Sequence, residues 1–78
     1  MKHKIWIEGY NITGQSQQAT QLVKDDGSTQ WEANSFKEAC KKAITELGWD
    51  MKHYDEDQNI YWGCRFFDSE KSAREAFG

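Results

Sequence analysis

The segment from Ser35 to Gly48 constrains the fold most, because every local signal in it favours one helix. Ser35 is a favourable N-cap, and Glu38 three residues later completes a capping box. Gly48 can take the left-handed conformation that ends many helices, so we expect Trp49 to pack back on Ile44. The apolar residues recur three and four positions apart and predict one buried stripe, made of Phe36, Ala39, Cys40, Ala43, Ile44 and Leu47.

Strand patterns precede this helix. Residues 4–10 alternate, with Ile5 and Ile7 on one face, as in a half-buried strand. The stretch from 11 to 21 is polar and rich in Gln, Ser and Thr, and we expect a surface loop there. Asp26-Gly27 favours a tight hairpin turn. The hairpin predicted around it joins residues 21–24 to residues 29–33.

A second hairpin is predicted after the helix, between residues 51–56 and 60–67, through an acidic turn at 57–59. In its second strand one face should carry Ile60, Trp62, Cys64 and Phe66, and the other Tyr61, Gly63, Arg65 and Phe67. Asp68 or Ser69 then begins a short last helix. Its inward residues are expected to be Ala73, Ala76 and Phe77.

These elements predict one α+β domain over residues 1–78, in the order β-ββ-α-ββ-α. We expect an antiparallel sheet of about four to five strands with the helices packed on one face. A chain of 78 residues has a small core. Aromatic residues make up 14% of it, including four tryptophans, and each buries a large area.

Composition also restricts the partners and the compartment. The formal net charge of −3 argues against a duplex-DNA-binding protein, which gains affinity by neutralising phosphates. No apolar run approaches the ~18 residues of a membrane span, so we expect no membrane partner. Glu8 interrupts the apolar residues near the N-terminus, which argues against a signal peptide. The expected compartment is the cytoplasm.

No constellation predicts catalysis, a cofactor or a metal. Cys40 and Cys64 fall at core positions and are expected to be free thiols, with a disulfide between them left open. The cysteines and histidines lack zinc-ligand spacing. The acidic run from Asp55 resembles the start of a calcium loop, but Ile60 stands where glycine is required and Phe66 where glutamate is required. We therefore expect a protein that is not an enzyme.

The sheet face away from the helices is the main candidate surface. It would carry the partner-binding residues Trp6, Tyr10, Tyr61 and Arg65, and aromatic residues and arginine are enriched at interface hot spots. The alternative is that the last helix or the 11–21 loop covers part of this face. Lys41 and Lys42 on the first helix are further candidates, although such a basic stretch is also typical of an ordinary solvated helix face.

The run Thr29-Gln30-Trp31-Glu32-Ala33-Asn34-Ser35-Phe36-Lys37-Glu38-Ala39-Cys40-Lys41 resembles a segment of small phage-encoded type I anti-CRISPR proteins. In both, a strand ending in Glu-Ala leads into a Ser-capped helix, and the resemblance extends over about residues 29–44. It implies binding to the backbone subunits of a CRISPR surveillance complex and blocking of DNA hybridisation. Lys41 is then the best-matched basic residue, with Lys42 beside it.

The leading hypothesis is a phage- or mobile-element-type interaction protein that blocks a surface of a larger host protein or nucleoprotein assembly. Self-association into a homodimer through the aromatic face is a further possibility. The alternative from another class is a single-stranded nucleic-acid-binding module, because bases stack on exposed aromatic side chains. Nucleic acid is a partner only in that alternative.

Overall fold

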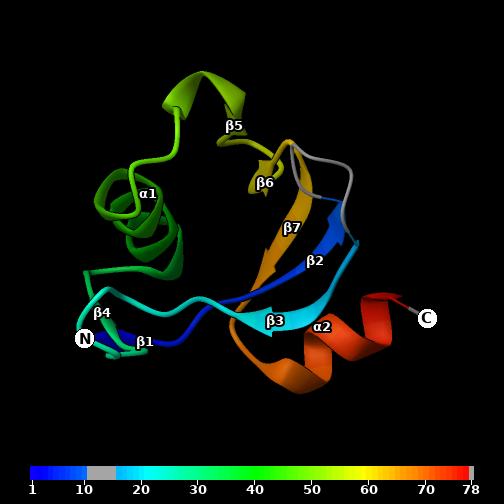
Figure 1. The fold of residues 1–78 in the computed structure, drawn as a ribbon, viewed down its shortest axis with the longest axis horizontal. Coiled ribbons are helices and arrows are strands. Elements are labelled where there is room, and N and C mark those ends of the chain that lie inside the picture. Colours follow the sequence, from blue (N-terminus) through cyan, green and yellow to red (C-terminus); the bar gives the residue numbers. More distant parts are fainter. Residues whose placement is uncertain (11–15, 78) are drawn as a thin grey trace.

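The computed structural model of the chain describes residues 1–10 and 16–77. Figure 1 shows how its helices and strands are arranged. The elements in chain order are β1 (Lys2–His3), β2 (Trp6–Tyr10), β3 (Ser16–Gln21), β4 (Trp31–Glu32), α1 (Phe36–Glu46), the 3₁₀ helix η1 (Met51–His53), β5 (Tyr54–Asp55), β6 (Ile60–Tyr61), β7 (Gly63–Phe67) and α2 (Glu70–Phe77).

A five-stranded sheet in the order β3-β2-β7-β6-β5 forms the centre of the molecule, and β1 and β4 form a separate two-stranded sheet. Every pairing is antiparallel. The central pair, β2 and β7, aligns Ile7 with Phe66 and Glu8 with Arg65. The predicted α+β class with an antiparallel sheet is therefore confirmed.

Both ends of α1 form as the sequence predicts. At the start, the Ser35 hydroxyl oxygen accepts a hydrogen bond from the Glu38 backbone N–H at 3.2 Å. At the end, Gly48 has a φ of 77°. The Trp49 N–H donates to the Ile44 carbonyl at 3.0 Å and the Gly48 N–H to the Thr45 carbonyl at 3.2 Å, which is the complete Schellman motif.

The stripe of α1 packs against one face of the sheet, which we call the α1 face and define by Ile7, Cys64 and Phe66. These residues share a buried cluster with the helix residues Ala39, Cys40, Ala43 and Ile44, and with Ile5, Leu22 and Trp31. Strands alternate their side chains, so the residues between Ile7, Cys64 and Phe66 point the other way. The main core therefore lies between α1 and the sheet.

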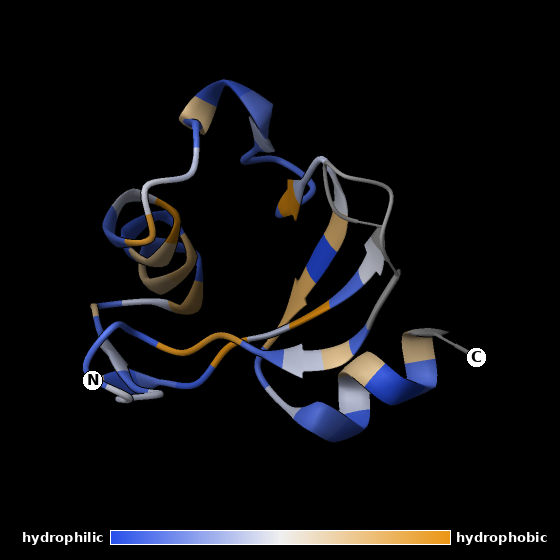
Figure 2. Ribbon diagram, in the orientation of Figure 1, coloured by the Kyte–Doolittle hydropathy of each residue, from blue (hydrophilic) through white to orange (hydrophobic). Residues whose placement is uncertain are grey.

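The second helix differs from expectation, because α2 lies on the opposite side of the sheet from α1 (Figure 1). It contacts β2, β3 and β7. The face that it covers, which we call the α2 face, carries Glu8 and Arg65 and, by alternation, Trp6 and Phe67. In Figure 2, α2 shows long hydrophilic stretches broken by short hydrophobic ones. Its inward residue Ala73 is fully buried, and Ser69 caps its start by accepting a hydrogen bond from the Ser72 N–H.

The N-terminal half departs from the predicted strand limits. The expected strand over 4–10 begins later, as β2 at Trp6, and a separate short strand, β1, precedes it and pairs with β4. Part of the expected 11–21 loop is the edge strand β3, which pairs with β2; residues 11–15 lie outside the described part. The turn near Gly27 forms, with the Gly27 N–H donating to the Lys24 carbonyl at 2.9 Å. The segments that flank it pair with other strands, β3 with β2 and β4 with β1, so the predicted hairpin of residues 21–24 with 29–33 is wrong.

The predicted strand over 60–67 is wrong as a continuous element. The chain reverses at Trp62 and Gly63, so β6 pairs with β7, and Tyr61 lies opposite Cys64. Directly opposed residues in an antiparallel pair point to the same face. The turn therefore moves Tyr61 onto the α1 face, whereas Arg65 stays on the α2 face.

A close contact between two backbones accompanies this reversal. Gly9 has a φ of +127°, and a Cβ added to it would lie 1.9 Å from the carbonyl oxygen of Gly63. Glycine is required at this position both for its conformation and for the approach of the neighbouring strand. On the other side of β2 the register with β3 shifts between Ile7 and Gly9, so Gln18 and Ala19 together oppose Glu8 in a β-bulge.

Candidate functional site

The aromatic face predicted from the sequence does not form as one open surface. Trp6 is half-buried on the α2 face, where it lies opposite Phe67. Tyr61 packs on the opposite face, next to the main core. The side chain of Tyr10 lies outside the described part of the chain.

Arg65 is engaged within the fold. Its Nε donates to Glu8 Oε1 at 2.8 Å, and its Nη2 also contacts this oxygen. The same Nη2 donates to the backbone carbonyl of Ala76 at 3.3 Å, and the guanidinium carbon lies 5.7 Å from the centre of the Phe67 ring. Glu8 is 5% exposed, whereas the Arg65 side chain is 49% exposed, so the pair connects two strands to α2 from the rim of the buried interior.

The two lysines predicted on α1 also have partners within the chain. Lys41 Nζ lies 2.6 Å from Glu56 Oε1, and this hydrogen bond raises the pKa of the ammonium and lowers the pKa of the carboxyl. Lys42 Nζ donates to the Glu32 carbonyl at 3.0 Å. Lys41 therefore connects α1 to the turn between β5 and β6, and Lys42 connects it to β4.

A different group of side chains gathers where η1 meets the turn between β6 and β7. We call it the aromatic corner, and it consists of Trp49, Met51, His53, Tyr61 and Trp62. The rings of Trp49 and Tyr61 are 5.0 Å apart between centroids. The His53 ring lies 6.2 Å from Tyr61 in an edge-on arrangement and 6.4 Å from Trp62. Three aromatic contacts thus connect these segments.

Trp62 is exposed, with 51% of its surface accessible, and so is Met51, with 42%. The backbone of Trp62 is left-handed, with a φ of 59°. This conformation costs a side-chain-bearing residue roughly 1–2 kcal/mol, and it is rare for bulky residues. The Trp62 N–H holds the turn by donating to the His53 carbonyl at 3.0 Å.

The aromatic corner rests on a hydrogen-bonded support. The Asp50 side chain accepts from the Lys52 N–H at 2.9 Å and caps η1. The Asp50 N–H donates to the Tyr61 hydroxyl at 3.1 Å, which fixes the ring that packs between Trp49 and His53. The Schellman end of α1 sets the start of this segment, because Trp49 is the residue that folds back on the helix.

The hairpin of β5 and β6 is attached to α1 by a short polar chain. The Tyr54 hydroxyl donates to Asn59 Oδ1 at 2.5 Å, and Asn59 Nδ2 donates to Cys40 Sγ at 3.6 Å. Burial raises the pKa of Cys40 to about 12 and that of Tyr54 to about 12. These groups keep their protons at neutral pH, and the chain positions the hairpin that presents the aromatic corner.

The two thiols of the described residues are shielded. Both cysteines are buried and free, and burial also raises the pKa of Cys64. A nucleophilic thiol needs a lowered pKa and access to its substrate. In residues 1–10 and 16–77, no group of three or more His, Cys, Asp or Glu side chains is arranged to hold a metal ion. No helix in the same ranges is both long enough and apolar enough to cross a membrane.

Of the predicted partner-binding residues, only Tyr61 lies in the aromatic corner. Sequence reasoning missed the ring contacts that Trp49, His53 and Trp62 make here, and the exposed Met51 on the same segment. One signal was present, since an isolated glycine within a strand pattern indicates a bulge or a close backbone approach. Gly63 is that glycine, and it lies against Gly9.

Comparisons of the chain with protein-family models, with curated proteins and with solved structures found no match.

Proposed function

We propose that this chain is a small interaction protein that binds, and thereby blocks, a surface of a larger protein or nucleoprotein assembly. The aromatic corner is the contact site. The observation that carries the proposal is Trp62, a bulky residue in a left-handed turn with half of its surface exposed.

Stability alone gives no reason for a tryptophan at this position. Glycine takes a left-handed φ without cost, so Gly at 62 would relax the turn by roughly 1 kcal/mol. An exposed ring contributes little to folding in return. Backbone conformations of this kind persist at binding sites, where they hold a side chain in the orientation that a partner needs.

The aromatic corner also has the composition of an interface centre. Tryptophan and tyrosine are the residue types most enriched at hot spots, and methionine adapts its shape to a partner. The segment is held in advance by the Asp50, Tyr61 and His53 hydrogen bonds, so little side-chain entropy is lost on binding.

The first assembly to test is a type I CRISPR surveillance complex, because of the resemblance of residues 29–44 to anti-CRISPR proteins. Binding of the purified complex to wild-type protein, Trp62→Gly and Arg74→Ala is measured by biolayer interferometry. Arg74 is the control, since it is exposed and lies on α2. Trp62→Gly should weaken binding by about 30-fold or more, as expected for a hot-spot residue. Its melting temperature should equal or exceed that of the wild type.

Three other outcomes would change the proposal. Unchanged binding by Trp62→Gly removes the aromatic corner as the contact site. A melting temperature lowered by Trp62→Gly assigns Trp62 a structural role. If the protein instead binds a single-stranded oligonucleotide, with affinity falling steeply between about 50 and 200 mM salt, the nucleic-acid alternative replaces the proposal.

A further inference from the structure

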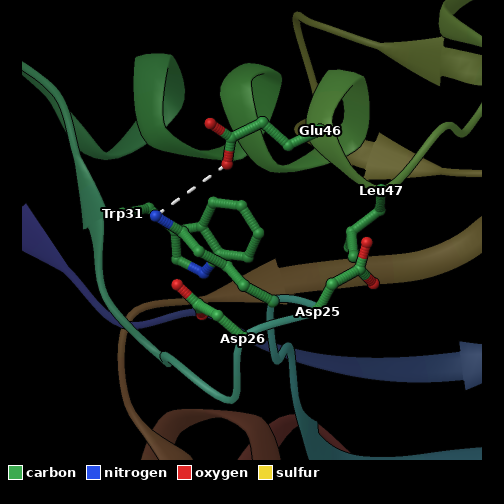
Figure 3. A pocket seen from close by; sticks show the side chains of 6 residues that line it. Asp25, Asp26, Trp31, Glu46 and Leu47 are labelled. Carbon is green, nitrogen blue, oxygen red and sulfur yellow. Dashed lines mark ion pairs between the residues drawn. The ribbon is translucent and has the colours of Figure 1, made fainter.

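A concave site lies beside the C-terminal end of α1, and its volume is about 350 Å³. We call it the acidic hollow. Figure 3 shows the indole of Trp31 surrounded by the side chains of Asp25, Asp26, Glu46 and Leu47, and Lys24 completes the lining. None of these residues belongs to the aromatic corner.

The acidic hollow has an excess of negative charge. Asp25, Asp26 and Glu46 line it together, and Lys24 is the one cation among its lining residues. Glu46 also lies in the last turn of α1, which contains no basic residue. The C-terminal end of a helix already carries a partial negative charge, so this position favours a cation.

Lys24 occupies this site from within the chain. Its Nζ lies 3.9 Å from Glu46 Oε2, the ion pair drawn in Figure 3, and 4.8 Å from the centre of the Trp31 ring. The ion pair is long, and the ammonium is held mainly by the ring and by the surrounding charge. The turn fixes only the backbone of Lys24, whose N–H donates to the Ser28 carbonyl at 2.8 Å. The side chain can therefore leave while the turn stays in place.

Trp31 provides an independent sign of a ligand. It is fully buried, and its Nε1–H has no hydrogen-bond acceptor among the described residues. Lys24 cannot satisfy this group, because an ammonium only donates. A buried donor without an acceptor costs roughly 1–3 kcal/mol, which a ligand with a carbonyl oxygen in reach would recover.

We propose that the acidic hollow binds an arginine residue presented by a partner protein. The guanidinium takes the place of the Lys24 ammonium over the Trp31 ring and pairs with the carboxylates, and a peptide carbonyl of the partner accepts from the Trp31 indole. Arginine fits better than lysine, because its planar guanidinium offers five donors to carboxylates on two elements and stacks on aromatic rings.

This inference goes beyond the proposed function, since it concerns a separate site with different chemistry. The two sites are neighbours along the chain. Leu47 lines the acidic hollow, and Trp49, two residues later, belongs to the aromatic corner. Only Gly48 separates these two residues in sequence, and each site can act alone.

The test uses NMR spectroscopy of the full chain with the peptide acetyl-Gly-Arg-Gly-amide. The Trp31 indole N–H and the backbone amides of Asp25, Asp26 and Leu47 are followed during titration. We expect saturable shifts of these signals, while the Trp62 indole signal stays constant. The same peptide with norleucine in place of arginine is the matched uncharged control and should cause no shifts.

Variants sharpen the result. Lys24→Met removes the internal competitor and should tighten arginine-peptide binding by about threefold or more, whereas Glu46→Gln should weaken it by about fivefold. Glu75→Gln makes the same charge change on α2 and should leave arginine-peptide binding unchanged.

Three results would overturn the proposal: equal shifts with the norleucine peptide, no saturable shift with the arginine peptide, or no tightening in Lys24→Met. An equal response to a lysine peptide would overturn the choice of arginine. None of these results depends on Trp62, so this proposal and the proposed function fail separately.

Discussion

The face of the sheet that meets α1 is closed by apolar side chains, whereas the face that meets α2 encloses a charged pair. On the α1 face, Ile7, Cys64 and Phe66 join the stripe of the helix in one buried cluster. On the α2 face, Glu8 and Arg65 lie between the strands and the helix, and Arg65 reaches the Ala76 carbonyl.

This difference suggests that the two faces contribute differently to stability and to the position of α2. Apolar burial is strong and tolerant of small shifts, so the α1 face should supply most of the folding free energy. A buried ion pair contributes little net stability but depends on geometry, so the α2 face should fix where α2 lies. Each prediction below tests one part of this division.

The largest expected effect is on the α1 face. Ala43 is fully buried in the seam between α1 and the sheet. Ala43→Asp places an unpaired charge there and should cost about 4 kcal/mol or more, enough to unfold a domain of this size. Circular dichroism at 25 °C measures it. Thr45→Asp on the exposed side of the same helix should cost below about 1 kcal/mol, and a folded Ala43→Asp protein would contradict the assigned helix face.

The second prediction concerns the sheet itself, at the close backbone contact between Gly9 on β2 and Gly63 on β7. Gly9→Ala puts a Cβ against the Gly63 carbonyl at a φ of +127° and should cost about 3 kcal/mol, measured by urea unfolding. Gly27→Ala is the matched control. Its φ is +86°, and nothing lies within 4 Å of the added Cβ, so about 1 kcal/mol is expected. Equal losses would show that the contact with β7 is unimportant.

The free energy of unfolding should also fall at alkaline pH, because Cys40 is buried, and Tyr54 partly buried, between α1 and the sheet. The pKa of Cys40 rises from 9.0 in the unfolded chain to about 12 in the fold, and that of Tyr54 from 10.0 to about 12. Above pH 9 the unfolded chain loses the Cys40 proton first, so stability present below that pH is lost as the pH approaches 12. By about pH 11 the loss from Cys40 is roughly 2–3 kcal/mol, at about 1.4 kcal/mol for each pH unit above 9.

Urea unfolding between pH 8 and about 11 measures this loss. Cys40→Ala should flatten the pH dependence and leave the smaller part from Tyr54. An identical pH dependence in the wild type and in Cys40→Ala would mean that the thiol is more accessible than the buried position of Cys40 indicates.

The smallest expected effect concerns the α2 face. Glu8→Gln removes the charge but keeps an acceptor oxygen, and should cost about 1–2 kcal/mol in urea unfolding. The loss stays below that of a fully buried pair because the Arg65 side chain is 49% exposed and can regain water. Glu70→Gln breaks the surface pair with Arg74 and should cost below about 0.5 kcal/mol. Equal effects would remove the distinction between the two pairs.

The sequence allowed α1 to be predicted almost to the residue, because its signals are local. The Ser35 cap, the apolar stripe and Gly48 all act within the helix itself. The side of the sheet that α2 covers was not predictable in the same way. Its inward residue Ala73 is small, and a helix that buries small side chains fits against either face.

The candidate site was predicted only at Tyr61, for a reason that lies in long-range pairing. Residues 60–67 alternate well enough to form one strand, and nothing within that segment requires a reversal. The reversal depends on Gly63 meeting Gly9, which are far apart in the chain. The change of direction at Trp62 exchanges the faces of Ile60 and Tyr61, the residues of this segment that precede it. Of the predicted partner-binding residues, only Tyr61 therefore lies in the aromatic corner.

The bulge in β3 bears on how readily a second copy could add to this edge of the sheet. β3 is an edge strand with an uncharged sequence, Ser-Gln-Gln-Ala-Thr-Gln, of the kind that readily adds further strands. Ala19, with a φ of 46°, interrupts the regular spacing of its outward backbone groups. A neighbouring copy therefore meets a bent edge with mismatched donors and acceptors. We expect deletion of Ala19 to straighten this edge and to favour strand addition between copies.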